Sequence, residues 1–129
     1  MSEKQVHHPL YQRFFRHYHQ EEYWEAHEVL EELWQKERDN DFYHGLIQVA
    51  AIMHQLKKGK VRGARKLASS AYGYLSPFAP EREGVDVDRV LSWLTACLRV
   101  LPDGVAQLEP GQVESFGLDV CPLPRLAQS

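Results

Sequence analysis

The sequence predicts an all-α fold, a single-domain bundle of about five helices with an irregular C-terminal tail. Apolar residues recur every three or four positions in five segments, which is the helical period. No segment shows the alternating pattern of a half-buried strand, and clusters rich in Gly, Pro, Asp and Asn separate the helical segments. The 129 residues suit one domain. We place the helical bundle at residues 1–104 and a Pro-containing tail at 105–129.

Two helices are expected in the first third of the chain. Pro9 suits the first turn of a helix, and apolar residues at helical spacing continue this helix to about His19. The second helix contains Tyr23–Trp34, places its apolar residues on one broad arc, and should end near Glu37, before a turn cluster at 38–41.

The third helix should be the centre of the bundle. It runs from about Asp41 to Lys58, with Asp41 as its N-cap. Its apolar residues cover nearly all sides, which is typical of a helix packed between others. Gly45 costs a helix about 1 kcal/mol relative to Ala, so we expect another helix to approach closely there.

Two further helices and the tail complete the predicted bundle. The fourth helix spans about Val61–Leu75 with Tyr72 among its inward residues, and the fifth spans about Asp86–Leu101 with Asp86 as its cap. Residues 81–85 read as a polar loop between them. The tail should pack on the bundle through Phe116, Leu118 and Val120.

Charge and composition limit the kinds of molecule that we expect the chain to bind and the compartment in which we expect it. The net charge of −3 is spread along the chain, so we expect no general nucleic-acid or membrane surface. A basic cluster at 57–66 is interpreted as a solvated turn, with RNA contact as the weaker alternative. Two separate cysteines, Cys97 and Cys121, favour a reduced, cytoplasmic protein. Because Met1–Pro9 is polar, we expect no signal peptide there, and no apolar run approaches the ~20 residues of a membrane span.

One polar constellation stands at the edge of the second helix. His27 and Glu31 are four residues apart, so their side chains meet over one turn. Antiparallel pairing of the second and third helices would bring His54 near them. Two imidazoles and a carboxylate are a ligand set for a divalent metal such as zinc, manganese or iron, with Glu28 as a catalytic base. Alternatively, His27 and Glu31 form a plain hydrogen-bonded pair, and His54 is a satisfied core histidine.

Three stretches together resemble a known family. YWEAHEVLEELW, GLIQVAAIMHQLKKG and RGARKL occur in the order and spacing of domain-of-unknown-function family 309, over residues 10–76. The resemblance implies a small helical bundle, and members are often labelled predicted metal-dependent hydrolases. Lys60 departs from the family pattern, which has Asn there. The family pattern falls on His27, Glu28, Glu31, Trp34, Gly45, Gln48, His54, Gly59, Gly63 and Ala64.

Two functions from different classes follow. The first is a metal-dependent hydrolase of an unknown small-molecule substrate, with His27, Glu31 and His54 as ligands. The second is a non-catalytic helical interaction module or homodimer. The second rests on the apolar third helix and on a faint repeat, in which EYWEAHEVLEELW aligns with KVRGARKLASSAYGYL at a spacing of 38 residues.

Overall fold

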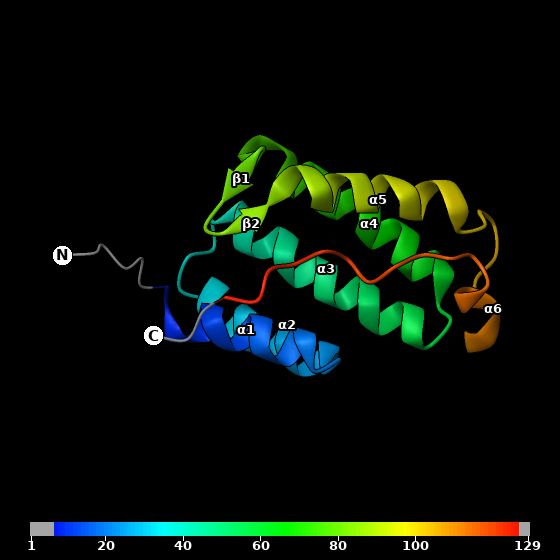
Figure 1. Cartoon of the computed structure of the whole chain (residues 1–129), viewed down its shortest axis with the longest axis horizontal. Coiled ribbons are helices and arrows are strands. Elements are labelled where there is room, and N and C mark those ends of the chain that lie inside the picture. The colour runs from blue at the N-terminus through cyan, green and yellow to red at the C-terminus, as the bar shows by residue number, and fades with distance from the viewer. Residues whose placement is uncertain (1–6, 127–129) are drawn as a thin grey trace.

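The computed structural model describes residues 7–126, which form a bundle of helices (Figure 1). The helices are α1 (Pro9–His19), α2 (Tyr23–Trp34), α3 (Asp41–Lys57), α4 (Val61–Leu75), α5 (Val87–Val100) and α6 (Pro110–Glu114). A 3₁₀ helix, η1 (Ser76–Phe78), and a hairpin of two-residue strands, β1 (Glu81–Arg82) and β2 (Val85–Asp86), join α4 to α5. The all-α class is confirmed. Residues 1–6 and 127–129, which the predicted bundle and tail include, lie outside the described residues.

The helix α3 lies at the centre, as its apolar composition predicts. It packs against α2 on one side and α4 on the other, while α1 covers α2 and α5 covers α4 (Figure 1). Its buried residues include Phe42, Leu46, Val49 and Ile52, which face these neighbours. The core is therefore continuous through all five long helices.

Gly45 marks a close approach between α3 and α4, as the sequence predicts. A Cβ atom at this position would lie 2.5 Å from Cγ of Leu75 and 2.6 Å from its Cδ2. Leu75 is fully buried, so its side chain has little room to move. The absence of a side chain at position 45 therefore sets the distance between the two helices.

The helix ends correct two predictions. The helix α2 ends at Trp34 rather than near Glu37, because the N–H groups of Lys36 and Glu37 bond carbonyls only three residues back. The N-cap of α3 is Asn40 and not Asp41, since the Asn40 side chain accepts the N–H of Tyr43 at 3.0 Å. The predicted cap of α5 is confirmed: the Asp86 carboxylate accepts the N–H of Arg89.

The C-terminal segment crosses the bundle as a strap (Figure 1). Tyr18 donates its hydroxyl to the carbonyl of Cys121 at 2.9 Å, and the indole N–H of Trp93 donates to the carbonyl of Asp119 at 2.6 Å. These bonds tie the segment to α1 and α5. The helix α6 was not predicted, and it carries a capping box formed by Glu109 and Gln112.

Three further predictions about side chains and loops are wrong. Val120 is 54% exposed, because the residues on either side of it turn inward or bond the bundle, whereas Phe116 and Leu118 are half-buried as predicted. Tyr72 is 41% exposed rather than inward, since it lies beside the edge of α5. The predicted polar loop at 81–85 contains the short hairpin. Among the described residues, no helix has both the length and the apolar composition needed to cross a membrane.

Candidate binding face on α2, α3 and α4

Half-buried residues line one side of the three central helices. On α3 they occur at spacings of four, three, three and one residues, which keeps them on a single stripe between α2 and α4. Adjacent stripes on α2 and α4 extend it in both directions. We call this surface the α2–α3–α4 face. Its residues are Trp24, His27, Glu31 and Trp34 on α2, His44, Gln48, Ala51, His54 and Gln55 on α3, and Gly63, Leu67, Ser70 and Tyr74 on α4.

Aromatic contacts join the three helices at one end of the face. The ring of His44 lies 4.5 Å from that of Trp34 and 4.3 Å from that of Tyr74, measured between ring centroids. The imidazole at the start of α3 is therefore held between the last turns of α2 and α4. These contacts show that α2 and α4 both run antiparallel to α3.

The opposite end of the face is built around Trp24. Its indole stacks on His27 with 4.8 Å between ring centroids and 14° between ring planes, and it lies 5.2 Å from the ring of His54. Beside them, the Gln55 amide lies against Gly63, where a Cβ would be 3.0 Å from Nε2. Trp24 itself is 48% exposed. Two imidazoles from different helices thus meet one exposed indole.

Three buried polar atoms on this face have no hydrogen-bond partner within residues 7–126. They are Nδ1 of His27, Nε1 of Trp34 and Oε1 of Gln48. Buried polar groups in folded proteins are nearly always paired, and an unpaired one costs about 1–3 kcal/mol. The described chain leaves these three atoms unpaired, so their pairing requires a water molecule or a group of another molecule.

The electrostatics of the Trp24 end favour a neutral imidazole. Burial lowers the pKa of His54, and the positive charge of Lys58 and the neighbouring His27 lower this pKa further. A neutral imidazole has one nitrogen that accepts a hydrogen bond or binds a metal. The hollow lined by Trp24, His54 and Lys58 has a volume of about 320 Å³.

The predicted metal ligands are only partly brought together. His27 and His54 share the Trp24 indole, Glu31 is half-buried on the same face, and Glu28 is exposed at its rim. Within the described part of the chain, no three His, Cys, Asp or Glu side chains are grouped so as to hold a metal ion. The set His27, Glu31 and His54 therefore stays a prediction. The alternative hydrogen bond to Glu31 is not formed through Nδ1 of His27.

Several positions of the resembled family pattern have structural explanations. Gly59 has a φ of +73°, and a Cβ there would overlap the carbonyl oxygen of Leu108. Lys60, at the position where the pattern has Asn, is the N-cap of α4 and makes no side-chain cap bond. The family residues Gly45 and Gly59 therefore shape the backbone, whereas His27, Trp34 and Gln48 carry the unpaired polar atoms.

Sequence reasoning missed the contribution of α4 to this face. Trp24 is exposed, whereas His44 lies half-buried between two aromatic rings, one from α2 and one from α4. Helical periodicity gives the sides of each helix but does not say which sides of separate helices become neighbours. The repeated half-buried spacing in α3 and α4 is the signal that could have found this surface.

The comparisons with known proteins agree with the sequence resemblance. The family model of the domain of unknown function DUF309 matches residues 11–67. The resemblance to DUF309 is therefore confirmed, over α1, α2, α3 and the first half of α4. No curated protein and no solved structure matches the chain. The matched segment contains every residue of the α2–α3–α4 face except Ser70 and Tyr74.

Proposed function

We propose that this chain is a non-catalytic helical interaction module that binds a protein partner through the α2–α3–α4 face. The observation that carries the proposal is the set of unpaired buried atoms on His27, Trp34 and Gln48. A partner would satisfy them with an acceptor for the indole N–H of Trp34, a donor for the amide oxygen of Gln48, and a group that suits the tautomer of His27. Because each unpaired group costs free energy in the isolated chain, pairing them favours association.

The composition of the face supports a protein partner. Trp and Tyr are enriched in the cores of protein interfaces, where they bury large areas with few rotatable bonds. Trp24, Trp34 and Tyr74 lie on the face, and none of them is fully buried. Half-buried polar side chains between these aromatic rings provide the hydrogen-bonding groups that a typical interface also contains.

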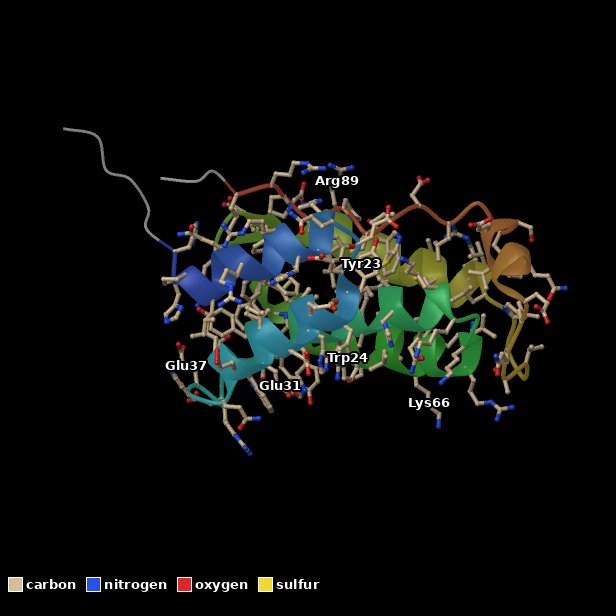
Figure 2. All side chains as sticks on the ribbon, turned by 90° about the horizontal axis from the view of Figure 1, so that it is seen from below. Tyr23, Trp24, Glu31, Glu37, Lys66 and Arg89 are labelled. Carbon is tan, nitrogen blue, oxygen red and sulfur yellow. The ribbon has the colours of Figure 1, made fainter. Side chains whose placement is uncertain are left out.

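Site-specific photocrosslinking in the native host tests this proposal. Lys66 is exposed on α4 beside the face, and Arg89 is exposed on the opposite side of the molecule (Figure 2). A photoreactive benzoylphenylalanine replaces one or the other at native expression level. We expect a protein adduct of defined mass from position 66 and little from position 89. Equal yields from the two positions, or no adduct from position 66, would contradict the proposal.

A metal-dependent hydrolase is the second candidate. It is favoured by the two imidazoles that meet at Trp24, next to a hollow of about 320 Å³, a size within the usual range of ligand sites. In this proposal His27, Glu31 and His54 hold zinc, manganese or iron, and Glu28 serves as a base. Such a metal supplies a bound water of lowered pKa. To bind one metal ion, the side chains of His27, Glu31 and His54 would have to come closer together than they are in this structure.

Metal analysis of tag-free protein tests the second candidate. The hydrolase proposal predicts about one equivalent of zinc, manganese or iron per chain after purification, and loss of that metal in both His27→Ala and His54→Ala. His8→Ala is the matched control, because His8 is the N-cap of α1, where its ring nitrogen accepts the N–H of Leu10, and it is not one of the proposed ligands. Metal-free protein whose unfolding temperature is unchanged by chelators would remove this candidate.

A further inference from the structure

We infer that the α2–α3–α4 face binds a second copy of this chain in a two-fold arrangement whose axis lies between the two faces and parallel to α3. This inference rests on the proposed function, because it names the occupant of the face proposed there. It is carried by the opposite charges of the two helices that flank α3.

The helices α2 and α4 carry charge of opposite sign. The helix α2 contains glutamates and no Lys or Arg, whereas α4 contains cations and no Asp or Glu. The acidic residues of α2 are Glu25, Glu28, Glu31 and Glu32, and the cations of α4 are Arg62, Arg65 and Lys66. Arg65 points to α5, where it donates to the carbonyls of Leu98 and Leu101. Arg62 and Lys66 are exposed, and Lys66 lies beside the face.

These charges do not neutralise one another within one chain. In the described part of the molecule, no ion pair joins a glutamate of α2 to any cation, and none involves Arg62 or Lys66. The helix α3 separates α2 from α4, so their axes lie roughly 16–20 Å apart, at 8–10 Å for each packed pair. That separation exceeds the screening length of about 8 Å at physiological salt.

A two-fold axis parallel to α3 would bring the opposite charges of α2 and α4 together between two copies of the chain. Rotation about such an axis lays the face of one copy on the face of the other and exchanges the two flanks. The acidic α2 then lies over the cationic α4 of the partner subunit, and this happens twice because the interface is isologous. An in-plane axis perpendicular to α3 would instead set α2 against α2, with like charges opposed.

The positions along the helices match in this arrangement. Trp24 and Gly63 both lie beside the last turn of α3. Glu28 follows Trp24 by four residues, about 6 Å along α2, and Lys66 follows Gly63 by three residues, about 4.5 Å along α4. Both helices run antiparallel to α3, so these offsets point the same way. Glu28 therefore comes within side-chain reach of the partner subunit's Lys66.

The shape of the face matches the same arrangement. Trp24 is the large exposed apolar side chain at one flank, and Gly63 has no side chain at the corresponding level of the other flank. Rotation about the axis along α3 places the indole of Trp24 over Gly63 of the partner subunit. At the centre, the small side chain of Ala51 lets the two α3 helices approach closely.

Charge exchange measured by sedimentation equilibrium tests this inference on the full chain. Glu28→Lys and Lys66→Glu each create two like-charge contacts per dimer, so each should weaken dimerisation about 10- to 100-fold. The double variant restores both contacts and should return the dissociation constant to within about threefold of the native chain. Glu114→Lys and Arg89→Glu are the matched controls, because both residues are exposed and away from the face. They should leave the dissociation constant of the dimer unchanged.

The native chain provides a second measurement that does not depend on the folding of a variant. Its dimer dissociation constant should rise as salt is added, because salt screens the flank contacts. A native chain that stays monomeric at all concentrations overturns the inference. A dimer whose dissociation constant is unchanged in both Glu28→Lys and Lys66→Glu also overturns the inference, since another surface then forms the dimer contact. If a monomer is accompanied by crosslinks from position 66 to a different protein, the proposed function stands and only this inference fails.

Discussion

Replacement of Gly45 by alanine tests the close packing of the two central helices. Alanine favours a helix over glycine by about 1 kcal/mol, whereas overpacking a core costs about 1–3 kcal/mol. The new Cβ would lie 2.5 Å and 2.6 Å from two atoms of Leu75, a fully buried side chain. We therefore expect the steric cost to exceed the gain and Gly45→Ala to lower the free energy of unfolding by up to about 2 kcal/mol.

Gly73 offers a matched control on the same pair of helices. It lies in α4, and a Cβ there would meet no atom within 4 Å. Gly73→Ala should therefore raise the free energy of unfolding by about 0.5–1 kcal/mol, through helix propensity alone. Urea unfolding followed by circular dichroism measures both variants, and the slope of the free energy with denaturant should stay unchanged.

A double-mutant cycle identifies the clash as the cause. Leu75→Ala alone should cost about 2–5 kcal/mol, because it opens a cavity in the core. In that background Gly45→Ala loses its opposing side chain and should become neutral or stabilising. The coupling free energy should then be about 1–3 kcal/mol. If Gly45→Ala stabilises the native chain as much as Gly73→Ala does, the argument from helix approach is wrong.

Three other predictions follow from the described contacts. Asn40→Ala should lower the free energy of unfolding by about 1 kcal/mol and Asp41→Ala by clearly less in urea titrations, since Asn40 is the cap; the reverse order would refute this assignment. Gln48→Met should stabilise the isolated chain by about 1 kcal/mol, because it removes an unpaired buried acceptor, yet weaken crosslinking from position 66; a destabilised chain would contradict it. Burial raises the pKa of Tyr18 well above its ordinary value of 10.0 and that of Tyr43 to about 12. The unfolded chain therefore loses these protons first, and the free energy of unfolding should fall as pH rises above 10. Tyr18→Phe should flatten this fall in alkaline unfolding curves, and an unchanged slope would count against the argument.

The bundle was largely predictable because its helices have clear periods and stops. The bounds of α1 and α4 agree with the sequence prediction, and Gly45 indicated a close approach before any neighbour was known. The choice between Asn40 and Asp41 as the cap was not predictable, because both residues cap helices well and they are adjacent. The helix α6 was missed because Pro110 and Gly111 suggest a break, although Pro also favours the first turn of a helix.

The site was predictable only one helix at a time. Spacing placed His27 and Glu31 at one edge of α2, and the antiparallel pairing with α3 agrees with the approach of His54 to Trp24. The role of Tyr74 was not predictable, because it depends on which side of α4 turns toward His44. That choice is made by the small and buried residues of the α3–α4 contact, which fix the rotation of α4 in three dimensions.

The central claim is that the α2–α3–α4 face is a protein-binding surface. The most direct test compares the crosslinking yield at position 66, at the rim of the face, with the yield at position 89 on the opposite side. With benzoylphenylalanine at position 66 in the native host, irradiation should give an adduct of defined mass, and the same residue at position 89 should give little. The mass of the adduct also separates a second copy of this chain from another protein. Equal yields from positions 66 and 89, or an irradiated chain that stays unmodified at position 66, would contradict the claim.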